Sequence, residues 1–139
     1  MPLFENTDEQ RIIDAYAAEG RTLDDLPYTD AFERIYDVLT AGDTDAAVTR
    51  AELFHRLHNL RKAGRLPRLG RAQGSLTRIE PQHEAFLIEL VHEKVGELSR
   101  RDRLPYTDDF ADIHTRFNDR TGLNLSPHQV WRIIAKLAK

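Results

Sequence analysis

The sequence predicts an all-α protein made of two tandem three-helix units, each of which ends in a helix-turn-helix pair. The phrase Leu-Pro-Tyr-Thr-Asp-Ala-Phe at residues 26–32 returns at residues 104–110 with one change, which indicates an internal duplication with an offset of 78. Apolar residues recur at helical spacing in six segments, and no segment reads convincingly as a strand. Capping residues and glycines mark the starts and ends of these segments.

The first helix is expected to start near Thr7, because Gln10 follows three residues later and completes a capping-box pattern. Gly20 is the predicted end of this helix, and residues 21–26 are then a loop. The apolar face of the helix is formed by Ile12, Ile13, Tyr16 and Ala17.

The repeated phrase opens the second helix of each unit. Thr29 is placed to cap the helix and Asp30 to occupy its first position, where a carboxylate interacts favourably with the helix dipole. Thr107 takes the same role in the second copy, and residues 41–45 form the turn after the first. The apolar stripes are Phe32, Ile35, Tyr36 and Leu39 in one unit and Phe110, Ile113, His114 and Phe117 in the other. We interpret the phrase as a structural start signal rather than as a binding motif.

The third helices have their own start signals. Thr49 forms a capping-box pattern with Glu52, and Ser126 is followed by Pro127, whose missing N–H costs nothing at the first helical position. Gly64 is expected to close the first of these helices. Their stripes match at an offset of 77: Leu53, Phe54, Leu57 and Leu60 against Val130, Trp131, Ile134 and Leu137.

The remaining helix is expected over residues 81–98, where Phe86, Leu87, Leu90, Val91 and Val95 form an amphipathic pattern. The predicted domains are therefore residues 1–63 and 80–139, joined by a basic linker at 64–79. About 60 residues is small for a lone domain, so we expect the units to share an interface or to be closely tethered.

The net charge of −3 is unevenly distributed along the chain. Residues 1–48 hold twelve acids and three bases, net −9; residues 49–78 hold eight bases and one acid, net +7; residues 79–139 are close to neutral at −1. A basic block of this kind is typical of a polyanion-binding surface, but also of an ordinary solvated helix and linker.

The segment from Phe117 to Trp131 combines an aromatic helix end, a turn with Gly122, a capped helix start and a Val-Trp pair. It resembles the homeodomain-like helix-turn-helix class, of which Myb and SANT-type repeats are the tandem form. Phe54 takes the place of Trp131 in the first unit. The resemblance implies DNA binding, with a third helix in the major groove.

The residues off the apolar stripes of the third helices suit that task. Arg and Asn pair with base edges, and Lys neutralises phosphate. Arginines in the linker would follow a phosphate backbone or enter a minor groove. The predicted contacts are Arg50, His55, Arg56, Asn59 and Lys62 in the first unit, Arg65, Arg68 and Arg71 in the linker, and Gln129, Arg132 and Lys136 in the second unit. His58 and Arg61 are placed on the same outer face.

We therefore expect a DNA-binding protein, a transcriptional regulator or an architectural factor, with RNA as the other nucleic acid that these residues would suit. The acidic residues 1–48 would repel phosphate, and they favour an alternative in which they pair with the basic block of another copy. The protein would then be a helical protein–protein interaction or homo-oligomerisation module with no nucleic-acid role. The fold alone does not decide between the two, because three-helix units serve both functions.

Other function classes find little support. The absence of cysteine excludes disulfides and thiolate metal sites. His55 and His58 lie three residues apart, but no carboxylate follows at ligand spacing, and no phosphate loop, dinucleotide motif or catalytic triad is present. We expect no catalysis, cofactor or metal. The longest apolar run falls short of the roughly 18 residues of a membrane span, and the start lacks the layout of a signal peptide, so a cytoplasmic protein is expected.

Overall fold

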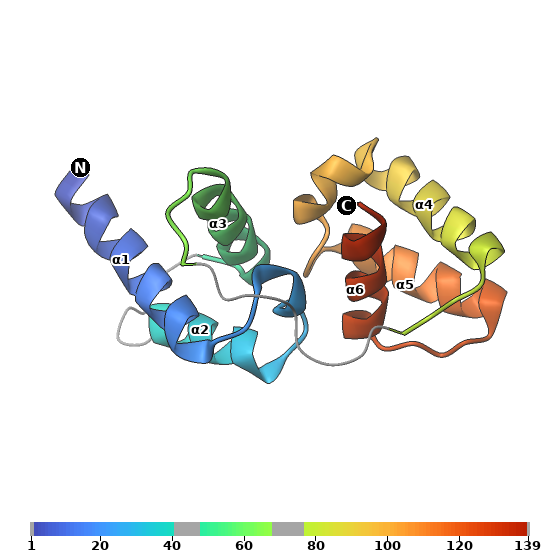
Figure 1. The fold of residues 1–139 in the computed structure, drawn as a ribbon, viewed down its shortest axis with the longest axis horizontal. Coiled ribbons are helices and arrows are strands. Elements are labelled where there is room, and N and C mark those ends of the chain that lie inside the picture. Colours follow the sequence, from blue (N-terminus) through green and yellow to red (C-terminus); the bar gives the residue numbers. More distant parts are fainter. Residues whose placement is uncertain (1, 41–47, 68–76, 139) are drawn as a thin grey trace. The chain divides into compact units, whose positions relative to one another are not determined.

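Six α-helices and two short 3-10 helices make up the regular structure of residues 2–40, 48–67 and 77–138, which are the residues that the computed structural model describes (Figure 1). The all-α prediction is confirmed, and these described ranges contain no strand. The chain divides into two units, Met1–Gln73 and Gly74–Lys139, and the division falls inside the predicted linker.

The first unit contains α1 (Pro2–Glu19), a 3-10 helix η1 (Leu23–Asp25), α2 (Asp30–Thr40) and α3 (Arg50–Lys62). The predicted start of α1 near Thr7 is wrong, because the helix already begins at Pro2. A proline fits a first helical turn, where its missing N–H would have no partner within the helix. The segment predicted as a loop at 21–26 contains η1 instead of irregular backbone.

The three helices of the first unit bury most of the predicted apolar stripes against one another. The prediction is wrong for Ala17, which is exposed, while Ile13 and Tyr36 are half-buried. Buried side chains are Ile12 and Tyr16 of α1, Phe32, Ile35 and Leu39 of α2, and Leu53, Phe54, Leu57 and Leu60 of α3. His58 is buried as well, at 5% exposed, so its prediction as a surface residue is wrong. It lies four residues after Phe54, and their ring centroids are 6.3 Å apart, so the buried face of α3 is wider than the stripe read from spacing.

The second unit contains α4 (Pro81–Val95), the 3-10 helix η2 (Leu98–Arg103), α5 (Asp108–Thr121) and α6 (Pro127–Leu137). The predicted end of α4 at residue 98 is wrong. Gly96 has φ +91, a backbone conformation that side chains rarely allow, and it ends the helix after Val95. The core consists of Leu87, Leu90, Val91, Leu104, Phe110, Ile113, Phe117, Leu125, Val130, Trp131, Ile133, Ile134 and Ala135.

The two copies of the repeated phrase have the same backbone and the same hydrogen bonds. Tyr28 and Tyr106 lie in the left-handed region, with φ of 66° and 65°. The Thr29 hydroxyl donates to the carbonyl of Leu26 at 2.6 Å and accepts from the amide of Phe32 at 3.2 Å. The Thr107 hydroxyl repeats both contacts at the same distances. The predicted threonine caps are confirmed.

In each unit a side chain of the second helix holds the turn that leads to the third. The Tyr36 hydroxyl donates to the carbonyl of Val48 at 2.8 Å. In the second unit Nε2 of His114 lies 2.7 Å from the carbonyl of Leu125, and the Asn118 amide bonds both the carbonyl and the N–H of Leu125 at 2.9 Å. Val48 and Leu125 each precede the cap of a third helix, so these bonds fix the direction in which that helix starts.

Candidate nucleic-acid interface

Helix α3 brings four of the predicted contacts together on one exposed side. The Thr49 hydroxyl accepts from the amide of Glu52 at 3.1 Å, which caps the helix, and the buried stripe turns the opposite side toward solvent. Spacings of three and four residues place side chains next to one another on a helix surface. His55, Arg56, Asn59 and Lys62 are all exposed.

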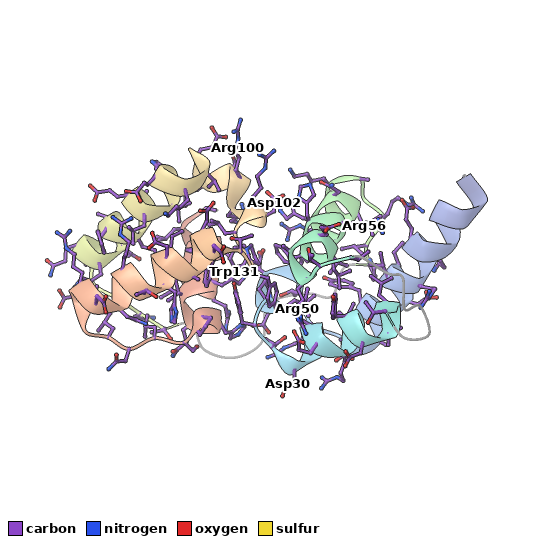
Figure 2. All side chains as sticks on the ribbon, turned by 180° about the vertical axis from the view of Figure 1, so that it is seen from behind. Asp30, Arg50, Arg56, Arg100, Asp102 and Trp131 are labelled. Atoms are coloured by element: carbon purple, nitrogen blue, oxygen red, sulfur yellow. The ribbon has the colours of Figure 1, made fainter. Side chains whose placement is uncertain are left out.

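Arg50, at the start of α3 (Figure 2), contacts two residues of its own unit. Its guanidinium forms a two-point ion pair with Glu33 of α2, at 2.7 and 3.0 Å, and lies 4.5 Å from the ring centroid of Tyr36. An exposed pair of this kind stabilises a protein by about 1 kcal/mol at most, so phosphate can compete for it. The guanidinium is nevertheless oriented by α2 rather than directed at a ligand.

Two further arginines of the basic block are also paired with acids of the first unit. Arg65 forms an ion pair with Glu9 of α1, and Nη1 of Arg61 lies 3.5 Å from a carboxylate oxygen of Asp24. The acidic segment and the basic segment therefore neutralise each other within one chain. Arg68 and Arg71 lie outside the described residues.

Arg56 and Lys62 differ from these arginines. Within residues 2–40, 48–67 and 77–138, neither side chain has an ion-pair or hydrogen-bond partner. Arg56 and Lys62 are thus the exposed cations of α3 that no described acid balances. They lie about one turn and nearly three turns beyond Glu52, with Asn59 between them. This leaves a positive strip with an amide at its centre.

The third helix of the second unit presents its predicted contacts differently. The amide of Gln129 accepts from the N–H of Ser126 at 2.8 Å and donates to the hydroxyl of Thr77 at 3.1 Å, so both of its ends contribute to the capping box and its surroundings. Arg132 is half-buried and Lys136 is exposed. Helix α6 therefore lacks the row of exposed side chains that α3 has.

A basic cluster that the sequence reading did not select lies on η2. Arg100, which Figure 2 labels, and Arg103 are exposed and have no partner among the described residues, and Arg101 is half-buried. The signal was present as three arginines in four residues directly before the second repeated phrase. The net charge of residues 79–139 does not reveal this cluster, because the acids of the same range balance its arginines.

The surface between α4 and α5 is neutralised internally. Nζ of Lys94 lies 2.8 Å from a carboxylate oxygen of Asp112, and Arg116 pairs with Glu93. The hydrogen bond with Asp112 raises the pKa of Lys94, and the same bond lowers the pKa of Asp112. These groups stay charged and paired at neutral pH, so this face is a poor site for phosphate.

No group of His, Asp and Glu in the described part of the chain is arranged to hold a metal ion. His55 is exposed, whereas His58 is buried. Of the helices that the structure describes, none has both the length and the apolar character needed to cross a membrane.

Comparison with known proteins found no family model that matches this chain, no similar curated protein and no similar solved structure. The homeodomain-like resemblance therefore stays a prediction from the sequence.

Proposed function

We propose that this protein is a DNA-binding protein rather than an enzyme, and that α3 of the first unit enters the major groove. The observation that supports this is the strip formed by Arg56, Asn59 and Lys62. The strip is exposed, and its two cations have no partner among the described residues, while the neighbouring basic residues are paired. A role in transcriptional regulation or in DNA architecture would follow from such binding.

The residue types of the strip match the readout chemistry of a major groove. Arginine pairs with the two acceptors of guanine, and asparagine with the acceptor and donor of adenine. Arg56 and Asn59 are three residues apart, about 4.5 Å along a helix axis, which is comparable with one base-pair step. Lys62, at the end of α3, is placed to neutralise a phosphate, and Arg65 adds a second such contact through the N–H donors that it does not use for Glu9.

The test is the anisotropy of a labelled mixed-sequence DNA duplex titrated with protein at 50 and 200 mM KCl. With two or three phosphates neutralised, the slope of log affinity against log salt should be about −2 to −3. The absence of salt-sensitive binding at micromolar protein would contradict the proposal. A duplex RNA of the same sequence should bind more weakly, because its major groove is too deep and narrow for a helix.

Matched variants separate the roles of the strip. Lys62→Gln should weaken binding to all sequences and reduce the salt slope by about 1. Arg56→Gln should weaken binding most on the preferred sequence, by a factor of about 10. Arg78→Gln removes one exposed charge outside the strip and should leave the affinity within about twofold, as expected for a charge that contacts no phosphate.

The alternative, self-association of the acidic and basic segments between copies, has less support. Glu9, Asp24 and Glu33 are engaged by arginines of their own unit. Sedimentation across a range of protein and salt concentrations distinguishes the two proposals. A salt-sensitive oligomer without DNA binding would favour the interaction module.

A further inference from the structure

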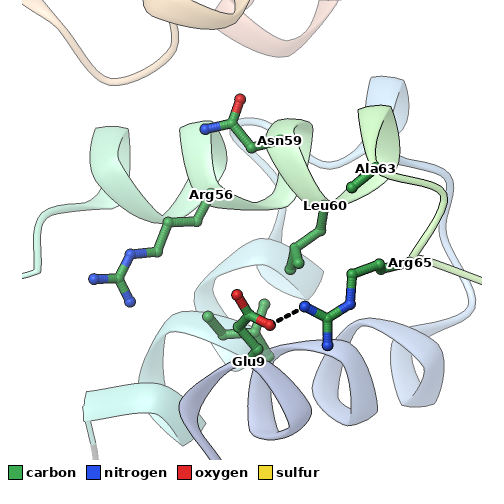
Figure 3. A pocket seen from close by; sticks show the side chains of 7 residues that line it. Glu9, Arg56, Asn59, Leu60, Ala63 and Arg65 are labelled. Carbon is green, nitrogen blue, oxygen red and sulfur yellow. Dashed lines mark hydrogen bonds and ion pairs between the residues drawn. The ribbon is translucent and has the colours of Figure 1, made fainter. Parts of the chain in front are cut away.

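The first unit contains a cavity of about 430 Å³ between α1 and the C-terminal half of α3 (Figure 3). This volume lies in the range of pockets that bind small organic molecules, roughly 300–1,000 Å³. Its lining consists of Glu9, Ile12, Arg56, Asn59, Leu60, Ala63 and Arg65. Nothing in the DNA-binding proposal requires a cavity at this place.

The cavity has an apolar floor and a positively charged rim. Ile12 of α1 and Leu60 of α3 form the floor, and they are 1% and 7% exposed. Arg56 and Arg65 extend on either side of Leu60, and the Glu9 carboxylate lies between these two side chains, paired with Arg65 (Figure 3). With two guanidinium groups and one carboxylate, the lining carries a net charge of +1.

The two arginines keep most of their hydrogen-bonding capacity. Arg65 uses Nη1 for Glu9, and no other hydrogen bond of its guanidinium occurs among the described residues; Arg56 makes none there. A guanidinium offers five N–H donors in a fork that matches the two oxygens of a carboxylate. The rim can therefore bind an anion without first breaking the Arg65–Glu9 pair.

We propose that this cavity binds a small organic monoanion, namely a carboxylate on a compact apolar body. The carboxylate would accept from Arg56 and Arg65, and the apolar body would cover Ile12 and Leu60. The Glu9 carboxylate in the rim would repel a dianion. The apolar floor offers no hydrogen bonds, so it would not compensate inorganic phosphate or a sugar for the loss of their hydration. The net positive charge of the lining and its apolar floor together favour a carboxylate that carries an apolar group.

Binding of such a ligand has a consequence for DNA, and this part alone rests on the proposed function. Arg56 and Arg65 are both predicted DNA contacts and both cavity residues. A carboxylate that occupies their donors excludes a phosphate or a guanine edge from the same atoms. The ligand would therefore lower the affinity of the protein for DNA by competing directly for these two arginines.

The test uses 2-naphthoate as the probe, with calorimetry for affinity and amide shifts in ¹⁵N-labelled full-length protein for location. Acetate provides the charge without the apolar body, and 2-naphthylmethylamine provides the body with the opposite charge. We expect naphthoate to shift amides of α1 and α3 and to bind at least tenfold more tightly than either control. Equal binding of naphthoate and the amine would overturn the proposal, as would shifts confined to other helices.

Two variants at exposed positions test the assigned residues without disturbing the core. Arg56→Gln should weaken naphthoate binding about tenfold, the usual effect of losing a charge-assisted pair. Ala63→Glu, which adds a second carboxylate to the lining, should reduce it at least as much. Arg78→Gln lies outside the cavity and should leave binding unchanged. Wild-type affinity in Arg56→Gln would refute the assignment of the anion subsite.

The competition is measured separately. Saturating naphthoate should raise the apparent Kd for the DNA duplex at constant salt, and acetate at the same concentration should not. If naphthoate binds but the protein has no affinity for DNA, the cavity assignment stands and the proposed function fails. If DNA binds and naphthoate does not, the reverse is true.

Discussion

The corner before the second helix ends in the same way in both units, with a 3-10 turn that leads into the repeated phrase, but η2 is longer than η1 and carries the opposite charge. In the first unit η1 carries Asp24 and Asp25, whereas in the second unit η2 carries Arg100, Arg101 and Arg103. The phrase that follows makes identical cap bonds in both copies. The two units thus have the same hydrogen bonds at the turn into the second helix, but they differ in the charge of the side chains on the preceding 3-10 helix.

The third helices also differ in charge, but here it is the first unit that has more exposed basic side chains. Helix α3 exposes a row that includes Arg56, Asn59 and Lys62, while among the predicted contacts of α6 only Lys136 is fully exposed. Basic charge is therefore concentrated on the third helix in one unit and on the corner in the other. The two units therefore differ in where their exposed basic side chains lie, and we expect only the first to bind DNA through its third helix.

The largest expected effect comes from the matched core positions. Phe54→Ala and Trp131→Ala should each lower the free energy of unfolding by about 3–5 kcal/mol. Because each unit has its own core, the loss should appear in the unit that carries the change, measured by amide hydrogen exchange. Equal loss of protection in both units would show that the cores are not separate.

The repeated caps should respond equally. Thr29→Ala and Thr107→Ala should each destabilise their unit by about 1 kcal/mol, since the hydroxyl contacts have the same lengths in both copies. Serine at either position keeps the hydroxyl and should recover most of the loss. Urea unfolding of the four variants measures this, and a clear difference between the two alanine variants would show that the copies are not equivalent.

Variants in the turn before each third helix should have effects as large as those of the caps or smaller. Tyr36→Phe removes the hydroxyl that donates to Val48 and should cost about 1 kcal/mol, while the ring under Arg50 is kept. His114→Phe should cost less, because Asn118 still donates to the same carbonyl of Leu125. Urea unfolding compares the pair. A larger loss for His114→Phe would contradict the assignment of these bonds.

Much of the fold follows from local rules in the sequence. Apolar spacing, threonine and serine caps and the glycines at residues 20, 64 and 122 located the helices, because these signals act over a few residues. The misses have tertiary or conformational causes. Burial of His58 depends on how widely α3 is covered, and the end of α4 depends on the left-handed conformation of Gly96.

The candidate site was less predictable. Spacing placed Arg50, Arg56 and Arg65 in one basic block, but it gave no indication of which of them would pair with acids from α1 and α2. The cavity was equally hidden, since it is formed by residues far apart in the chain. Ion pairs and cavities depend on how the helices pack against one another, and the spacing of apolar residues along the sequence does not specify that packing.

Amide shifts of the full-length protein on addition of a DNA duplex test the central assignment most directly. We expect the largest shifts at residues 55–62 of α3 and at Arg65, with small changes on α6. Largest shifts on η2 or α6, with α3 unaffected at saturating DNA, would contradict the assignment of α3 as the DNA-binding helix.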